Sequence, residues 1–294
     1  MRMIMKNWFL ILFVLSLTSC TENAFHEDKI FAGGVVATKA QLSSGKQIYM
    51  EYCMACHGAK GDGNGVASKG MSNPPRNFTL GTFKFGNVVS GDLVHDDTLI
   101  NIIKKGLHGS GMLPWDVSEE QAFNVVQYIK TFAPDTWEGS DKTLGEKIKI
   151  TKNPYGMARN SSAVARGKEV YHIIAQCWSC HRAYADKRDL NAMNKKINGE
   201  DFEDYDAEMY ELKIQDSDHG YRNMPPDFTW HTVKSAKTIE DLYVRISAGV
   251  GGTTMASWQD TIEDDDIWAV AHYIKYLMDL KDKKEREDLV GKLP

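Results

Sequence analysis

Apolar residues recur at intervals of three and four along several separate stretches of the chain. Such spacing places them on one face of an α-helix. The clearest stretches are 98–105 (TLINIIKK), 118–132 (SEEQAFNVVQYIKTF), 241–248 (DLYVRISA) and 263–277 (EDDDIWAVAHYIKYL). Shorter helical segments are predicted at 45–52 and 167–174. The chain is therefore expected to be all-α.

These helices belong to an order of elements that occurs twice. Each copy runs helix, Cys-x-x-Cys-His, Pro-Pro turn, helix, methionine-containing loop, terminal helix. In the loops, Gly106 matches Gly249, Met112 matches Met255 and Trp115 matches Trp258, each pair 143 residues apart. The shared order indicates an internal duplication and two domains.

Two motifs carry the chemistry, "CMACH" at 53–57 and "CWSCH" at 177–181. Two thiols one helical turn apart can add to the two vinyl groups of a haem, and the histidine that follows can ligate its iron. A redox-active cysteine pair and a zinc site of four cysteines are the alternatives, but neither explains the two histidines. The predicted haem c attachment and proximal-ligand residues are Cys53, Cys56, His57, Cys177, Cys180 and His181.

On these motifs each half resembles a class I cytochrome c domain, and the whole is similar to tandem dihaem cytochromes c. The resemblance covers roughly residues 43–133 and 163–280. It implies two haem c groups, each beneath crossing N- and C-terminal helices. Gly45 would then lie near Tyr128, and Gly167 near Tyr273. The resemblance makes Met112 and Met255 the distal iron ligands.

The rival distal ligands have no counterpart at the matching repeat position. They are Met71, Met224, His108 and His272, which are more typical of surface or packing residues. A thioether ligand favours ferrous iron and raises its potential relative to a second imidazole. Both irons are therefore expected to be His/Met ligated.

The resemblance also gives the Pro-Pro turns a role. A proline carbonyl there accepts the second N–H of the proximal histidine, which orients the ring. The candidates are Pro74, Pro75, Pro225 and Pro226. Arg76 is expected to pair with a haem propionate, whereas the second half places Asp227 at that position.

The N-terminus predicts export. Arg2 and Lys6 precede an apolar run too short to span a bilayer, which is typical of a signal peptide. It ends in "LTSC", which resembles a bacterial lipobox with Cys20 as the lipidated residue; an ordinary signal peptide is the alternative. The protein is expected to be lipid-anchored at the periplasmic face of the inner or outer membrane, or at the outer cell surface.

The remaining segments complete the expected organisation. His57 and Pro74 are 17 residues apart, but His181 and Pro225 are 44 apart, so the second domain carries an acidic insertion near 184–220. This insertion is either a solvated loop or a docking surface for a basic partner. The predicted units are signal peptide 1–19, tether 20–42, domain 43–133, linker 134–162, domain 163–280 and charged tail 281–294.

Net charge and the distribution of Lys and Arg exclude one class of partner. The net charge is −5 and no dense Lys/Arg cluster is present, which argues against a nucleic-acid partner. We expect a one-electron carrier, not an enzyme, exchanging electrons with a quinol-oxidising complex, a dehydrogenase, or a terminal reductase or oxidase. The alternatives are a dihaem peroxidase-type or thiosulfate dehydrogenase-type enzyme, or a haem subunit of a larger oxidoreductase.

Overall fold

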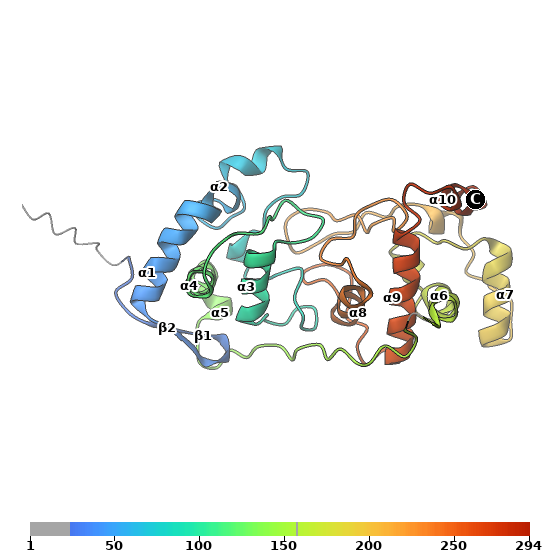
Figure 1. Ribbon diagram of the computed structural model, residues 1–294, viewed down its shortest axis with the longest axis horizontal. Helices are drawn as coiled ribbons and strands as arrows, with labels where there is room; N and C mark the ends of the chain where they lie inside the picture. Colours follow the sequence, from blue (N-terminus) through green and yellow to red (C-terminus); the bar gives the residue numbers. More distant parts are fainter. Residues whose placement is uncertain (1–23, 157) are drawn as a thin grey trace, which may run out of the picture.

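Two helical domains lie one after the other along the longest axis of the molecule (Figure 1). The computed structural model describes residues 24–156 and 158–294. The predicted signal peptide and Cys20 lie outside them. Within the described residues, no helix combines the length and apolar character needed to cross a membrane. The mostly helical architecture confirms the expected fold class.

The first domain has two long crossing helices, α1 and α4, with the remaining elements around them. Its elements are α1 (Lys39–Ile48), the π-helical turn η2 (Tyr49–Cys53), α2 (Met54–His57), the 3-10 turns η3 (Val66–Gly70) and η4 (Phe78–Leu80), α3 (Asp96–Lys105), α4 (Glu119–Lys130) and α5 (Pro134–Trp137). Both α1 and α4 begin with a capping box, at Thr38 and Ser118.

The second domain repeats this order around the crossing helices α6 and α9. Its elements are α6 (Asn160–Glu169), the π-helical turn η5 (Val170–Ile174), η6 (Cys177–Ser179), α7 (Lys187–Asn198), η7 (Ala207–Tyr210), α8 (Ile239–Ala248), α9 (Asp264–Met278) and α10 (Lys284–Val290). Each domain has its own core of buried apolar residues.

A glycine at each helix crossing lets the two backbones touch. A Cβ atom at Gly45 would lie 2.0 Å from the Asn124 carbonyl oxygen and 3.0 Å from the Tyr128 Cβ atom. In the second domain, a Cβ atom at Gly167 would lie 2.0 Å from the Ala269 carbonyl oxygen. Only glycine permits this approach, and the expected pairing of terminal helices is confirmed.

The segment expected to be a tether is partly folded. A short antiparallel hairpin of β1 (Lys29–Phe31) and β2 (Val35–Ala37) packs onto the first domain. Phe31 is fully buried, and the hairpin is held by the linker through a bond from the Gly139 N–H to the Ile30 carbonyl at 2.9 Å. Within the segment predicted as a tether, residues 29–37 are thus folded onto the first domain, because long-range contacts order them.

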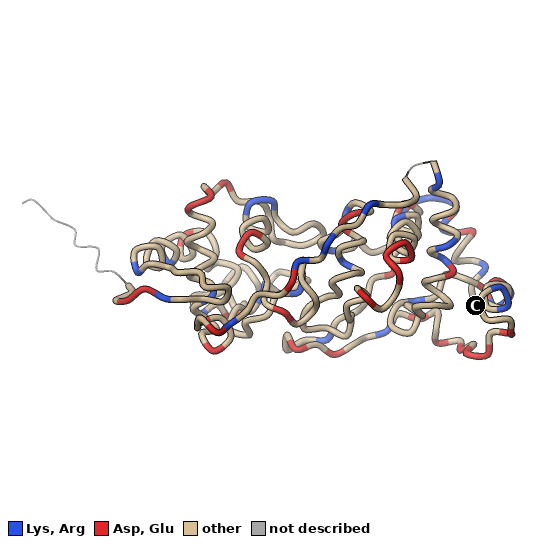
Figure 2. Tube along the Cα trace, turned by 90° about the horizontal axis from the view of Figure 1, so that it is seen from below, with Lys and Arg blue, Asp and Glu red and all other residues tan. Residues whose placement is uncertain are grey.

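The linker also packs on both domains. Figure 2, drawn from the linker side, shows it crossing between the domains with basic residues along it. The Ile148 N–H donates to the Asn87 carbonyl at 2.8 Å, and the Ile148 side chain joins the second core. Farther along, the Trp268 indole donates to Thr151 at 3.1 Å.

The acidic insertion and the tail are folded as well. The insertion contains α7 and η7 over a small third core that includes Leu190, Phe202 and Met209. In the tail, the Arg286 side chain donates to the Thr229 carbonyl at 3.1 Å. The predicted charged tail therefore contains a helix, α10, that is docked on the second domain.

Candidate haem sites

The four motif cysteines form two separate pairs. All are free, half-buried thiols. Cys53 packs against the first core and Cys177 against the second, so the pairs cannot share one four-cysteine site. Burial raises the pKa of Cys53 to about 11 and that of Cys177 to about 12. Cys53 and Cys177 are therefore protonated at neutral pH, and none of the four thiols is joined in a disulfide, as addition to haem vinyl groups requires.

A π-helical turn leads into each motif and ends at Cys53 in the first domain and at Ile174 in the second. In the first domain the Met54 N–H donates to the Tyr49 carbonyl, and in the second the Ala175 N–H donates to the Val170 carbonyl at 2.8 Å. A π-helical turn contains one residue more than an α-helical turn. This extra residue changes the direction of the chain as it reaches the cysteines. Between Tyr171 and the second motif there are two extra residues compared with the first domain.

A buried tyrosine fixes the residue after each proximal histidine. The Tyr49 hydroxyl donates to the Gly58 carbonyl at 2.7 Å, and the Tyr171 hydroxyl donates to the Arg182 carbonyl at 2.8 Å. This role of the two tyrosines was not predicted from the sequence. The signal was present in the shared Gly-Lys-x-x-Tyr of residues 45–49 and 167–171.

The His57 ring is held on two sides. Its Nδ1 atom lies 3.0 Å from the Arg76 carbonyl oxygen, and the ring stacks on Phe78 with a centroid distance of 4.5 Å. This arrangement leaves Nε2 available as a ligand. The predicted acceptors, Pro74 and Pro75, do not bind the His57 ring, because the carbonyl of the following residue, Arg76, faces Nδ1 instead.

His181 stacks in the same way on Phe228, with a centroid distance of 4.8 Å. Burial lowers the pKa of His181 to about 4, and the Pro226 carbonyl opposes this shift. Among the described residues, no group forms a hydrogen bond of normal geometry with Nδ1, and the neighbouring acceptor is the Pro226 carbonyl. The neutral imidazole is the form that binds iron.

Phe78 and Phe228 stack on the two proximal histidines and therefore occupy equivalent positions in the two domains. Their equivalence corrects the sequence alignment of the two Pro-Pro turns. Before them, Asn77 accepts from the Thr79 N–H at 2.9 Å, and Asp227 accepts from the Thr229 N–H at the same distance. Equivalent residues in this region are thus 150 apart. Arg76 therefore corresponds to Pro226, and not to Asp227 as the Pro-Pro match suggested.

The loop of Met112 is closed by short-range hydrogen bonds. The Met112 N–H donates to the Ser110 hydroxyl at 3.1 Å, and its carbonyl accepts from the Leu107 N–H at 2.8 Å. Gly106 has a φ of 70°, and a Cβ atom there would lie 2.7 Å from the Met112 carbonyl oxygen. The Met112 side chain is half-buried against the first core.

The loop of Met255 has the same hydrogen bonds and the same close approach at its glycine. The Met255 N–H donates to the Thr253 hydroxyl at 3.2 Å, and its carbonyl accepts from the Val250 N–H at 3.0 Å. Gly249 has a φ of 75°, and a Cβ atom there would lie 2.6 Å from the Met255 carbonyl oxygen. The two loops thus hold their methionines with the same pattern of backbone hydrogen bonds.

Three of the four rival ligands have other partners or are exposed, whereas Met71 lies beside the Met112 loop, with its sulfur 3.8 Å from a Cβ atom placed at Gly111. Both ring nitrogens of His272 are hydrogen-bonded, to Asn160 at 2.8 Å and to Asn153 at 3.0 Å, which confirms a packing role. The His108 carbonyl accepts from the Ser235 N–H of the other domain at 3.0 Å. Met224 is half exposed.

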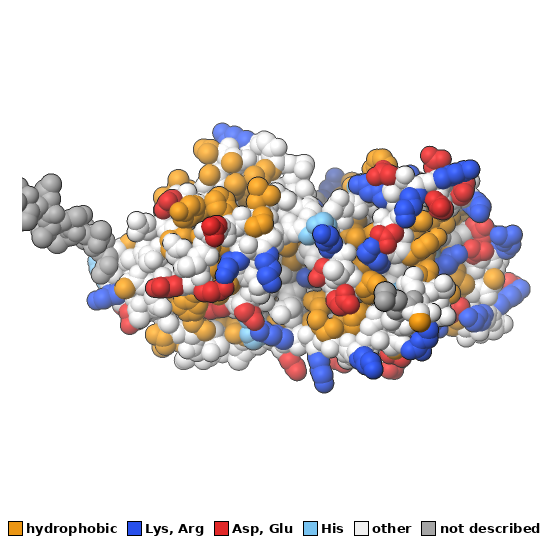
Figure 3. All heavy atoms as spheres, in the orientation of Figure 1, with side chains coloured by type: hydrophobic (Ala, Val, Ile, Leu, Met, Phe, Trp, Pro, Cys, Tyr) orange, Lys and Arg blue, Asp and Glu red, His pale blue; other side chains and the backbone are white. Residues whose placement is uncertain are grey.

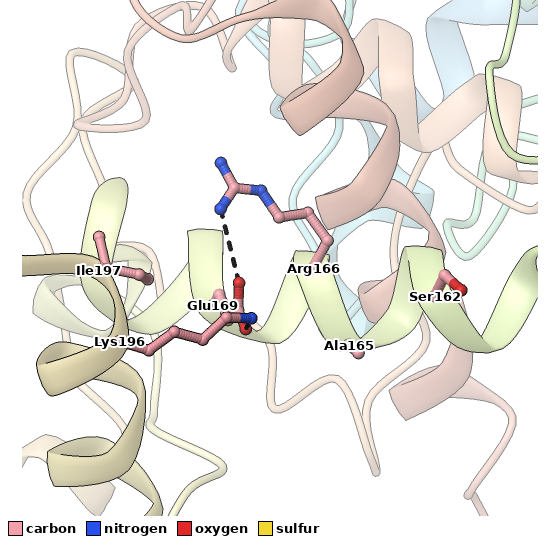
Figure 4. A pocket seen from close by; sticks show the side chains of 6 residues that line it. All are labelled: Ser162, Ala165, Arg166, Glu169, Lys196 and Ile197. Atoms are coloured by element: carbon pink, nitrogen blue, oxygen red, sulfur yellow. Dashed lines mark hydrogen bonds and ion pairs between the residues drawn. The ribbon is translucent and has the colours of Figure 1, made fainter.

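A pocket away from the motifs has no predicted site residue in its lining. It is an open groove of about 630 Å³ between α6 and α7, lined by Ser162, Ala165, Arg166, Glu169, Lys196 and Ile197 (Figure 4). Its charged groups pair with one another, Glu169 with both Arg166 and Lys196. Among the residues described, no three His, Cys, Asp or Glu side chains are grouped to hold a metal ion.

Comparison with known proteins agrees with the duplicated geometry. The family model described as cytochrome c oxidase, cbb3-type, subunit III matches twice, at residues 40–129 and 162–274. A search of curated sequences gives no match. Among solved structures, the chain is similar to one in the reducing HAO-like protein complex of Kuenenia stuttgartiensis. The identity is 30% and the TM-score 0.62, over 80% of this chain and 95% of that one.

The residues present fit a covalently bound haem in cytochrome c domains. Each motif offers two free thiols and a buried, stacked histidine. Haem c supplies one-electron transfer when bound. The chain is a tandem c-type cytochrome that belongs to the cbb3-type cytochrome c oxidase subunit III family.

Proposed function

We propose that the protein is a dihaem one-electron carrier with both irons His/Met ligated. Cys53 and Cys56 would attach one haem, with His57 and Met112 as its axial ligands. In the second domain, the corresponding residues are Cys177, Cys180, His181 and Met255. The observation that carries this proposal is the equal hydrogen bonding of the two methionine loops.

The matched loops favour a carrier over an enzyme. A peroxidase-type or thiosulfate dehydrogenase-type mechanism needs one iron that opens or has a different distal ligand. In that case one loop would be expected to lose its methionine or change its backbone. Both loops here keep the methionine, the hydroxyl two residues before it and the positive-φ glycine.

We further propose that the carrier works within or beside a larger redox assembly. The similarity to one chain of a HAO-like complex supports a subunit role. Apolar side chains form patches on the face of the first domain that Figure 3 shows. Leu113 and Trp115, directly after Met112, are 67% and 37% exposed. Such apolar residues near a redox centre suit brief contact with a protein partner, including the quinol-oxidising, dehydrogenase or terminal enzymes expected above.

Export and lipid anchoring at Cys20 remain part of this proposal. They are supported by the basic and apolar N-terminal sequence before "LTSC". Mass measurement of the mature N-terminal peptide tests them directly. A diacylglyceryl-cysteine at Cys20 is the expected result, and a chain cut elsewhere without lipid would contradict the anchor.

The experiment for the carrier function uses the full chain produced with a haem-attachment system. Intact mass should exceed that of the polypeptide by two haems, and the double variant Cys53→Ser/Cys56→Ser should lose one. Reductive titration should then take up one electron per haem. Peroxide or thiosulfate turnover by the unmodified protein would overturn the carrier assignment in favour of an enzyme.

A further inference from the structure

The two domains meet through reciprocal contacts. The Lys84 ammonium of the first domain donates to the Asn223 side chain of the second at 2.5 Å. The Lys234 ammonium of the second domain donates to the Asn73 side chain of the first. Lys84 and Lys234 are 150 residues apart, as are Asn73 and Asn223. Equivalent residues therefore exchange partners, as in a symmetric dimer.

Backbone hydrogen bonds also connect each methionine loop with the other domain. The Gly251 N–H donates to the Lys84 carbonyl at 3.0 Å, so the Met255 loop touches the first domain. The Ser235 N–H donates to the His108 carbonyl at 3.0 Å, so the Met112 loop touches the second. Both predicted distal loops thus line the interface, and both haem sites border it.

Two further cations at the interface, Arg76 and Arg245, do not follow this two-fold relation. Arg76 of the first domain contacts the buried His219 of the second, with 2.6 Å between Nη1 and Nδ1. Arg245 of the second domain donates to the Gly86 carbonyl at 3.1 Å and lies over the Phe85 ring of the first. Arg76 and Arg245 have no cationic counterpart, because Pro226 and Ile102 stand at the equivalent positions.

These cations lack acidic partners. Throughout residues 24–156 and 158–294, no Asp or Glu oxygen lies within 4 Å of the charged groups of Arg76, Lys84, Lys234 or Arg245. Burial lowers the pKa of Lys84 to about 8 and that of Arg245 to about 10. Buried cations are costly unless an anion pairs with them.

Unused hydrogen-bond donors accompany the cations. Four buried groups at or beside the interface have no acceptor among the described residues: Thr82 Oγ1, Asn223 Nδ2, Ser235 Oγ and Arg245 Nε. Buried donors of this kind normally have a partner. Cations and unpaired donors together favour an anionic ligand with several acceptor oxygens, as carboxylates have.

We propose that Arg76, Lys84 and Arg245 form a carboxylate-binding site at the domain interface that holds propionate groups of both haems. This inference rests on the proposed function. Each haem carries two propionates, and both haem sites border the interface. Residues of one domain would then neutralise carboxylates of the haem in the other, and each domain would influence the potential of its neighbour's haem.

The test uses the haem-loaded full chain and its two reduction potentials. Lys84→Met and Arg245→Met should each lower both potentials, because an unneutralised carboxylate stabilises the oxidised, more positive haem. We expect about a tenfold change in each reduction equilibrium, or about 59 mV for a one-electron couple. Lys84→Arg keeps the charge and should restore the potentials. Lys69→Met removes an exposed charge of the first domain and should leave both unchanged.

The possible results distinguish a failure of the proposed function from a failure of the interface site. A chain that carries fewer than two haems contradicts the proposed function itself. Two bound haems whose potentials do not respond to Lys84→Met and Arg245→Met, or respond equally to Lys69→Met, overturn the interface site alone.

A second measurement on the unmodified chain covers the case in which these variants do not fold. Salt screens exposed charges far more than buried ones. The potentials should therefore change little when sodium chloride is added, and a strong salt dependence would place the propionates in solvent.

Discussion

Gly45 of α1 touches Asn124 of α4 through backbone alone, since a Cβ atom at Gly45 would lie 2.0 Å from the Asn124 carbonyl oxygen. Gly45→Ala should therefore force the two helices apart. Overpacking of this kind costs about 1–3 kcal/mol, measured as the free energy of unfolding of the haem-loaded chain in denaturant. Gly70→Ala is the control, because a Cβ atom there meets nothing within 4 Å. Equal losses in the two variants would contradict the close crossing.

The buried Lys130 is stabilised by Asp96. Its ammonium lies 2.5 Å from Asp96, and the Lys130 side chain is fully buried while Asp96 is 16% exposed. Asp96→Asn leaves a buried cation without its anion and should cost about 3–5 kcal/mol of unfolding free energy. Lys130→Met should cost less, because Asp96 retains its bond from Gln127 at 2.7 Å.

The repeat supplies the control for this prediction. Lys275 is equivalent to Lys130 but forms an exposed pair with Asp279. Asp279→Asn should cost less than about 1 kcal/mol. If Asp96→Asn and Asp279→Asn have the same effect in denaturant unfolding, the buried ion pair is not important for stability.

His172 should make the fold sensitive to acid. Its Nδ1 atom lies 2.8 Å from the Lys168 carbonyl and Nε2 accepts from the Tyr184 N–H at 3.0 Å, so the ring is neutral in the folded state. Burial lowers the pKa of His172 to about 3. The unfolded chain binds a proton near pH 6.5, so this residue reduces stability as pH falls from about 6.5 to 3.

His172→Gln isolates this contribution because glutamine does not titrate. Between pH 7 and pH 5, the unmodified protein should lose more unfolding free energy than the variant. The same loss in both proteins would show that His172 does not couple folding to protonation.

Much of the fold was predictable because the duplication repeats its local signals. Met112 and Met255 were matched from sequence, and their loops have the same hydrogen bonds. The crossing at Gly45 was also expected and found. Such features depend on residues close in sequence or on one helix face, which periodicity can reveal.

Other features depend on long-range contacts that periodicity does not report. The hairpin at 29–37 is ordered by the linker, and Lys84 and Lys234 gain their partners only when the domains meet. Extending the alignment from Phe78 and Phe228 would have found this pair, since Thr-x-Lys occurs at 82–84 and 232–234. The Pro-Pro match was one residue out of register and hid it.

Distal ligation by methionine is the central claim, and optical spectroscopy of the oxidised protein tests it most directly. An iron–thioether bond gives a weak charge-transfer band at the red end of the visible spectrum. Met112→Ala and Met255→Ala should each remove about half of this band, and the double variant should lose it entirely while keeping two covalent haems. A band unchanged in either single variant, or absent from the unmodified protein, would contradict the account.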